Sequence, residues 1–150
     1  MSNRSRWWVA VALLTTVTAA AQVAAPSIAG ISLGMTAEQT RGAVGRADRE
    51  SESLGMRFWE YSRRGVTVIW KEGEAGVHGI VASRPAAGQV SGVKIGDPEV
   101  ELRNTWGTPA RERQSGRFLD FIGAGWVLSA ELRDGKVVQI TLMAAGAASH

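Results

Sequence analysis

Hydrophobic and polar residues alternate in six short stretches of the chain, separated by glycine-containing segments. Three lie in the first half, at 57–61, 66–70 and 77–82, and three in the second, at 117–122, 126–131 and 136–143. Alternation with a period of two is typical of strands that bury one face. The connections are short, and Asp134-Gly135 is a strong signal for a tight hairpin. Such connections join antiparallel neighbours, so the pattern predicts two three-stranded meanders.

A short helix is predicted before each meander. In the first half Thr36 is a candidate N-cap, with Gln39 three residues later to complete a capping box. In the second half Asp97 is the candidate N-cap and Pro98 takes the first helical position, where a missing N–H has no cost. Gly45 and Gly107 are placed to end the two helices.

The two halves are related by an internal repeat. Residues 30–45 align without a gap on 92–107, and 57–61 align on 117–121. A repeat of this kind is a stronger indication of the overall architecture than any local sequence pattern. It divides the chain into a signal peptide (1–21), a flexible lead-in (22–29), repeat unit one (30–83), a connector (84–91), repeat unit two (92–143) and a flexible tail (144–150).

The N-terminus has the pattern of an export signal. Arg4 and Arg6 precede an apolar run at 7–14 and small residues that end in Ala19-Ala20-Ala21. We expect cleavage near Ala21, and hence a periplasmic or secreted protein. An uncleaved membrane anchor is the alternative, but the apolar run is short for a span of about 20 residues.

Charge and cysteine content narrow the possible partners. The chain has 17 Lys and Arg against 14 Asp and Glu, and the signal peptide removes two of the arginines. The remaining chain is almost neutral and has no long basic run, so we expect no nucleic-acid partner. There is no cysteine, so no lipid anchor can be attached to one and no disulfide can form.

Comparison of the two units assigns residues to the two faces of the predicted sheet. Trp59 and Tyr61 match Leu119 and Phe121, and all four are placed on the face that the helices cover. His78 matches Val138 on the same face, as a half-buried structural histidine. We therefore predict an α+β fold with a tandem duplication. Each unit is a short helix plus a three-stranded antiparallel β-meander, with the helices packed on one sheet face. Whether the two sheets join is left open.

The opposite face is more apolar than contact with solvent alone would select. Parity places Phe58, Glu60 and Ile69 of unit one on it, and Phe118, Asp120 and Val127 of unit two. Apolar patches with a charged rim mark protein-binding sites. These six residues are the predicted partner-binding site, with Phe58 and Phe118 as its aromatic anchors.

The motifs resemble a group of exported proteins. Gly-Ile-Ser-Leu-Gly-Met-Thr-Ala-Glu-Gln at 30–39, Val44-Gly45 and a meander with an aromatic first strand are similar to the SmpA/OmlA outer-membrane assembly lipoproteins and to the β-lactamase-inhibitor-protein-like fold. The tandem arrangement is closer to the inhibitor protein, which has two such modules side by side. The resemblance implies the fold and the exported compartment. The missing cysteine departs from the lipoproteins.

Few residues suggest chemistry. Glu60 and Asp120 hold equivalent positions and would suit a glycosidase-like acid and base if they came close together, although duplication alone produces such a pair. Asp97, Glu99 and Glu101 offer oxygen ligands to a metal, but acidic residues also favour helix N-termini. No known catalytic motif is present. We predict no catalytic residue, no metal and no cofactor.

These observations favour a non-catalytic protein-binding or scaffold module of the cell envelope, with an envelope or secreted protein as its partner. The first alternative is an inhibitor of a secreted or periplasmic hydrolase. The second is a small hydrolase that uses Glu60 and Asp120.

Overall fold

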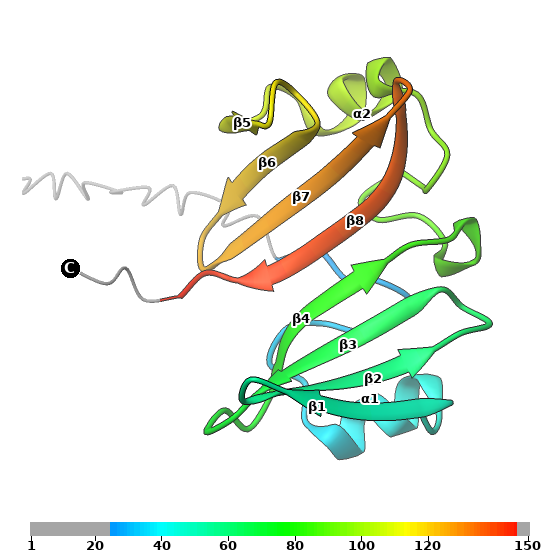
Figure 1. Cartoon of the computed structure of the whole chain (residues 1–150), viewed down its shortest axis with the longest axis vertical. Coiled ribbons are helices and arrows are strands. Elements are labelled where there is room, and N and C mark those ends of the chain that lie inside the picture. Colours follow the sequence, from blue (N-terminus) through cyan, green and yellow to red (C-terminus); the bar gives the residue numbers. More distant parts are fainter. Residues whose placement is uncertain (1–24, 147–150) are drawn as a thin grey trace, which may run out of the picture.

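A computed structural model of the chain describes residues 25–146. Its main element is one antiparallel sheet of eight strands, in the order β1-β2-β3-β4-β8-β7-β6-β5 (Figure 1). The strands are β1 (Arg49–Ser53), β2 (Met56–Tyr61), β3 (Val66–Lys71), β4 (Val77–Ala82), β5 (Arg111–Arg113), β6 (Phe118–Gly123), β7 (Trp126–Arg133) and β8 (Lys136–Ala144). The helices are α1 (Ala37–Val44), α2 (Glu99–Trp106) and a 3-10 turn η1 (Pro85–Ala87). The predicted signal peptide, residues 22–24 of the predicted lead-in and residues 147–150 of the predicted tail lie outside the described residues.

The predicted fold class is wrong. Each half contributes four strands instead of three, and all eight strands belong to a single sheet, with only two short helices. The halves join where β4 pairs with β8, as Ile80 opposite Leu142 and Ala82 opposite Ile140. The molecule is therefore mostly one sheet, and not two helix-plus-meander units.

The two strands missed by the sequence analysis are β1 and β5, the edges of the sheet. Their sequences, Arg-Glu-Ser-Glu-Ser and Arg-Glu-Arg, contain no apolar residue, and nearly all their side chains are exposed. A strand exposed on both faces has no alternation for a pattern to detect. Charged residues on an edge also discourage pairing with a further strand.

The helices begin and end largely as predicted. Thr36 and Gln39 form the capping box of α1, and Gly45 and Gly107 end α1 and α2 with positive φ angles of 82° and 85°. The predicted N-cap of α2 is wrong by one residue. Pro98 holds the N-cap position, and the Asp97 carboxylate accepts a hydrogen bond from the Lys94 N–H at 3.0 Å. No helix within residues 25–146 is long and apolar enough to cross a membrane.

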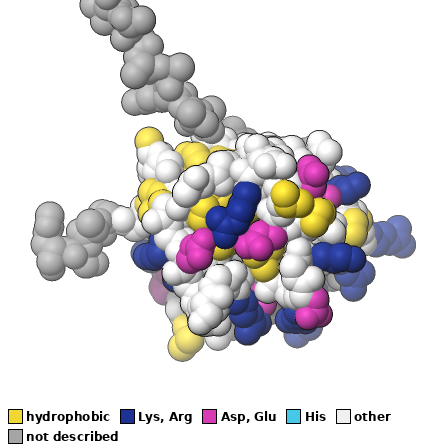
Figure 2. Space-filling view, turned by 90° about the horizontal axis from the view of Figure 1, so that it is seen from above, with side chains coloured by type: hydrophobic (Ala, Val, Ile, Leu, Met, Phe, Trp, Pro, Cys, Tyr) yellow, Lys and Arg dark blue, Asp and Glu magenta, His cyan; other side chains and the backbone are white. Residues whose placement is uncertain are grey.

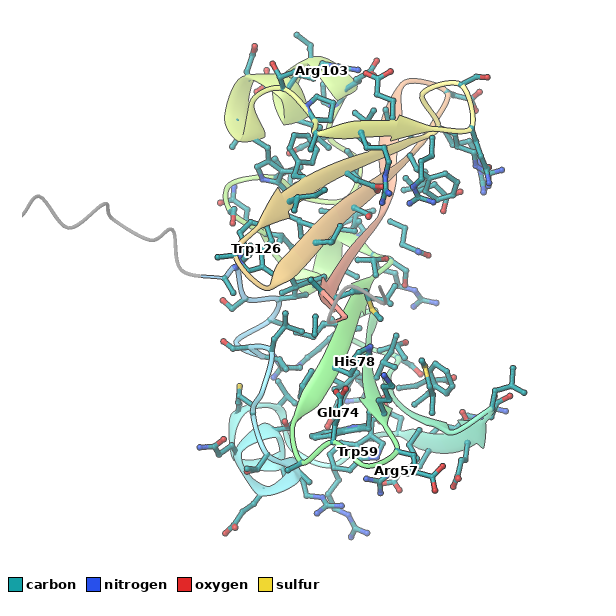
Figure 3. All side chains as sticks on the ribbon, turned by 90° about the vertical axis from the view of Figure 1, so that its left-hand side faces the viewer. Arg57, Trp59, Glu74, His78, Arg103 and Trp126 are labelled. Atoms are coloured by element: carbon teal, nitrogen blue, oxygen red, sulfur yellow. The ribbon has the colours of Figure 1, made fainter. Side chains whose placement is uncertain are left out.

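Both helices lie on the same face of the sheet, where they cover the core (Figure 3). Trp59 and Trp70 are buried there, with ring centroids 4.7 Å apart, and Trp106 and Trp126 pack at the edge of the core. Arg41 of α1 lies over the Trp59 ring, and Arg103 of α2 reaches Glu112 of β5. Ile28 of the predicted lead-in and Val90 of the predicted connector are also fully buried.

Candidate functional site

The face of the sheet opposite the helices, here called the outer face, carries a row of polar side chains that crosses all eight strands. The register places its members side by side, in the order Arg49, Glu60, Thr67, Val81, Thr141, Ser129, Asp120 and Arg111. Counted from either edge of the sheet, the row has an arginine, an acidic residue and a hydroxyl residue in that order, because the second half repeats the first. Only Val81, opposite Thr141 at the centre, lacks a polar side chain.

An apolar flank lies on one side of this central row. We define it by the residues whose register places them together on the outer face, with the tip of the β1–β2 hairpin: Leu54, Met56, Phe58, Ile69, Val127, Met143 and Ile122. Ile69 is buried, whereas Ile122 is 57% exposed and Leu54 is fully exposed. The flank crosses both halves of the sheet without a charged side chain between Phe58 and Ile122.

Leu54 sits at the tip of the hairpin between β1 and β2 in an unfavourable conformation. Its φ angle is +51° and that of Gly55 is +74°, which are the signs of a tight two-residue turn. Asn, Asp and Gly suit the first position of such a turn, because a larger L-residue is strained there. A fully exposed leucine at this place lacks any contribution to folding that would explain it.

Gly79 makes room for Met143 in the middle of the apolar flank. The two residues face each other across β4 and β8, and a Cβ atom on Gly79 would overlap the Met143 sulfur. The thioether therefore lies directly on the backbone of β4. Methionine adapts its shape to many partners, so its position between Ile69 and Val127 suits a contact surface.

The outer face is highly charged near β5 and β6, where Asp120 is enclosed by arginines. Arg113 donates hydrogen bonds to both Asp120 carboxylate oxygens, at 2.7 Å and 3.0 Å, and Arg111 and Ser129 donate one each at 2.8 Å and 2.7 Å. The carboxylate is fully buried. The hydrogen bonds from Arg113 are the main cause that lowers the pKa of Asp120 to about 2; burial opposes the shift, and Ser129 and Arg111 add to it.

Two guanidinium groups pack against the Phe118 ring. Those of Arg113 and Arg117 lie 4.9 Å and 5.3 Å from its ring centroid. Arg117 also pairs with Glu131, with its Nε 3.1 Å from Oε1, and Arg133 approaches the same oxygen at 3.7 Å. We call Arg111, Arg113, Arg117 and Arg133, with Asp120, Glu131 and Phe118, the arginine flank. Its four cations exceed its two carboxylates.

All six predicted partner-binding residues lie on the outer face, but they do not form one cluster. Phe58, Ile69 and Val127 belong to the apolar flank, Glu60 and Asp120 to the central row, and Phe118 to the arginine flank. The two predicted anchors therefore differ. Phe58 faces Ser51 of β1, whereas Phe118 faces Arg113 of β5 and is covered by it.

Several residues of this face were missed by the sequence analysis. Leu54 and Ile122 lie in or beside turns, and Arg111 and Arg113 lie in an edge strand without an apolar pattern. A signal for Leu54 does exist in the sequence, since Leu54-Gly55 holds the place of an Asn-Gly or Asp-Gly turn. Nothing in the sequence pairs Arg113 with Asp120, because that pairing depends on the register of β5.

Glu60 and Asp120 do not form a catalytic pair. They lie in β2 and β6, which are five strand spacings apart in the sheet. At about 4.8 Å per spacing the two carboxylates are separated by roughly 24 Å. Glycosidase carboxylates lie within about 10 Å of each other. Asp120 is moreover held ionised by two arginines.

The remaining candidates have structural explanations. His78 is buried, sits at a bulge between β3 and β4, and its Nδ1 lies 2.9 Å from Glu74 Oε2 (Figure 3). Glu99 pairs with Arg103 within α2. No group of three potential metal ligands occurs within the part of the chain that the structure describes. Figure 2 looks onto the α2 end, where basic and acidic side chains are interleaved.

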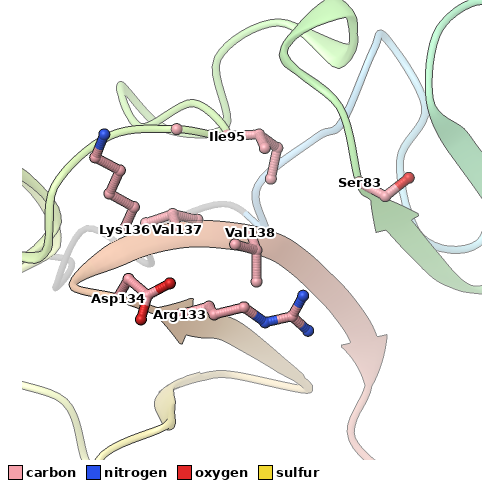
Figure 4. A pocket seen from close by; sticks show the side chains of 8 residues that line it. Ser83, Ile95, Arg133, Asp134, Lys136, Val137 and Val138 are labelled. Atoms are coloured by element: carbon pink, nitrogen blue, oxygen red, sulfur yellow. The ribbon is translucent and has the colours of Figure 1, made fainter.

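An open pocket of about 610 Å³ lies beside the β7–β8 hairpin (Figure 4). Val137 and Val138 line it with Arg133, Asp134 and Lys136 of the hairpin, and Ser83 and Ile95 lie opposite. Its charged side chains are of both signs, and none converges with another on one point. We assign no chemistry to it.

Comparison with known proteins supports the fold alone. No protein-family model matches the sequence, and neither does the sequence of any curated protein. Solved structures that resemble it include a cysteine-rich secretory protein from Staphylococcus aureus, with a TM-score of 0.54 and 14% identity over 75% of this chain. A DUF4309 family protein (YjgB) from Bacillus subtilis has a TM-score of 0.51 and 12% identity over 73% of this chain and 78% of its own.

A third structure is an extracellular protein containing a SCP domain from Bacillus anthracis, with a TM-score of 0.49 and 12% identity over 75% of this chain. The chain corresponds to only 44% of this protein and 44% of the Staphylococcus aureus protein. None of the three is described as an SmpA/OmlA lipoprotein or a β-lactamase inhibitor. The resemblance to those families therefore stays a prediction from sequence.

Proposed function

We propose that this protein is an exported, non-catalytic binding module that engages a protein partner through the outer face of its sheet. The observation that carries the proposal is the apolar flank, which exposes Leu54 and Ile122 at its two ends and crosses both halves of the molecule. Apolar side chains gathered on one face, next to charged ones, are typical of protein-binding surfaces. A merely solvated sheet face would carry polar residues at these positions.

Export is supported by the sequence at 1–21, which has the order of regions found in signal peptides. The similar Staphylococcus aureus protein is described as secretory. A non-catalytic role is supported by the wide separation of Glu60 from Asp120 and by the arginine pairs that hold Asp120 ionised.

The second candidate function is inhibition of a secreted or periplasmic hydrolase. One observation favours it, namely the exposed Leu54 at the tip of the β1–β2 hairpin. A projecting tip with an apolar side chain is suited to insertion into a concave site on an enzyme. Dose-dependent inhibition in a panel of secreted hydrolases, lost in a Leu54→Asn variant, would favour this role over a scaffold role.

The proposal is tested by crosslinking in the native host, followed by recovery of the protein with its partners. A variant that combines Phe58→Ser with Ile122→Ser removes two members of the apolar flank. The matched control is Val100→Ser on α2, since Val100 is 59% exposed and Ile122 is 57% exposed. We expect partner recovery to fall in the flank variant and to persist in the control. Unchanged recovery in the flank variant would show that the outer face is not the binding surface.

A further inference from the structure

We infer that the partner of the outer face is a protein segment that places carboxylate side chains on the arginine flank while its apolar side chains contact the apolar flank. This inference rests on the proposed function and adds the chemistry of the partner. The two halves place their strands at equivalent positions on the outer face, but the side chains at these positions differ in charge and polarity.

The arginine flank has more positive charge than it needs to satisfy its own carboxylates. Asp120 is already held by both oxygens through Arg113, so Arg111 is a second partner for it. Arg117 holds Glu131 through one oxygen, Oε1, and Arg133 lies 3.7 Å from the same oxygen. The side chains of Arg111 and Arg133 are 58% and 66% exposed, so an incoming carboxylate can reach the edges of the two guanidinium groups that Asp120 and Glu131 do not occupy.

The flank is also rigid, which favours recognition. The guanidinium groups of Arg113 and Arg117 both pack against the Phe118 ring, and each is also held by a carboxylate, Asp120 or Glu131. Asp120 orients Arg111 in the same way, through its Nε–H at 2.8 Å, and a guanidinium that is already oriented loses less side-chain entropy when it binds a further carboxylate. Unit one has Ser51 where unit two has Arg113, so its Phe58 has no such cover from β1.

The neighbouring apolar flank favours an acidic protein segment over a nucleic acid. Only Asp120 and Ser129 lie between the pair Ile122 and Val127 of the apolar flank and the pair Phe118 and Glu131 of the arginine flank. A ligand that covers both flanks must therefore offer carboxylates and apolar groups side by side. A phosphate backbone would leave Ile122 and Leu54 without apolar partners. An extended peptide with alternating apolar and acidic residues meets both requirements.

The probe for this inference is a synthetic peptide, acetyl-Leu-Glu-Leu-Glu-Phe-Glu-Leu-Glu-amide, titrated into the ¹⁵N-labelled protein. We expect saturable shifts of the arginine side-chain signals of the flank and of the Ile122 amide, with binding that weakens as salt is added. Arg111→Gln combined with Arg133→Gln leaves each carboxylate with one arginine, and we expect it to weaken binding at least about fivefold. The control, Arg46→Gln with Arg63→Gln, makes the same change in net charge at exposed positions elsewhere.

The outcomes separate this inference from the function on which it rests. Equal weakening by both double variants, or tighter binding of a ten-residue oligothymidylate than of the peptide, would overturn the inference. Peptide binding that Phe58→Ser with Ile122→Ser abolishes, and that Arg111→Gln with Arg133→Gln leaves unchanged, would overturn the inference and retain the proposed function. If neither double variant changes peptide binding, and if partner recovery in the native host is also unchanged in the Phe58→Ser with Ile122→Ser variant, both the inference and the proposed function are overturned.

Discussion

Leu54 and Asp134 hold the same position in two hairpin turns of the same type. Each is the first residue of a two-residue hairpin turn followed by glycine, and their φ angles are +51° and +52°. The flanking pairs, Ser53 with Met56 and Arg133 with Lys136, close the two hairpins in the same way. Aspartate is a residue that such a turn favours, whereas leucine is strained in it. The β1–β2 hairpin is therefore strained at a residue whose apolar side chain is fully exposed.

The first prediction separates stability from binding at this position. Leu54→Asn relieves the strain, so we expect the free energy of unfolding to rise by about 0.5–1 kcal/mol. The same change removes an end of the apolar flank, so recovery of the partner should fall. Urea denaturation and crosslinked recovery measure the two effects. Asp134→Asn is the control, and it should change neither; a Leu54→Asn variant that binds normally would remove Leu54 from the site.

The second prediction concerns Asp120. Its pKa is about 2 in the folded protein against an ordinary value of 3.8. A lowered pKa means that the ionised carboxylate stabilises the fold above pH 4, and this contribution is lost as the pH falls towards 2. We expect Asp120→Asn to cost about 2 kcal/mol at pH 7 and progressively less at lower pH. Denaturation curves at pH 2, 3, 4 and 7 give the difference.

Glu60→Gln is the matched control for Asp120, since it neutralises the equivalent carboxylate in β2. Glu60 forms no ion pair within residues 25–146, so its replacement should have little effect on stability at pH 7. A cost for Asp120→Asn that does not change between pH 7 and pH 2 would contradict the assignment of the arginine pairs.

The third prediction concerns the contact between Gly79 and Met143. A methyl group on Gly79 would overlap the Met143 sulfur, so we expect Gly79→Ala to destabilise the fold by about 1–3 kcal/mol. Gly79→Ala combined with Met143→Ala should recover part of that loss, because the sulfur is then absent. Gly42→Ala in α1 is the control: its Cβ would have open space, and it should stabilise by about 0.5–1 kcal/mol. Equal effects of Gly79→Ala in both backgrounds would show that Met143 does not lie on the backbone.

The fourth prediction distinguishes the two phenylalanines that the repeat makes equivalent. Phe58→Ala should reduce partner recovery, because Phe58 belongs to the apolar flank. Phe118→Ala should reduce the salt dependence of peptide binding, because it removes the ring that orients Arg113 and Arg117. Crosslinked recovery measures the first effect, and peptide titrations at low and high salt measure the second. Identical behaviour of the two variants would mean that the flanks act as one surface.

The sequence predicted what depends on local pattern and on the repeat. The six apolar strands, the capping box at Thr36 and the glycine ends of both helices follow from neighbouring residues, and the alternation of side chains places Phe58 and Phe118 on the outer face. The charged edge strands β1 and β5 were not predicted, because nearly all their side chains are exposed and their sequences show no alternation of apolar and polar residues. The joining of all eight strands into one sheet was not predicted, because it depends on the pairing of β4 with β8, which are far apart in the chain.

Photo-crosslinking at single positions tests the central claim, that the outer face binds a protein partner, most directly. A photoreactive phenylalanine analogue is placed at Ile122 on the outer face or at Val100 on α2, two apolar positions of almost equal exposure on opposite faces of the molecule. Illumination in the native host should give a discrete adduct from position 122 and none from position 100. An adduct from position 100 alone would contradict the account, because the partner would then bind the helical face.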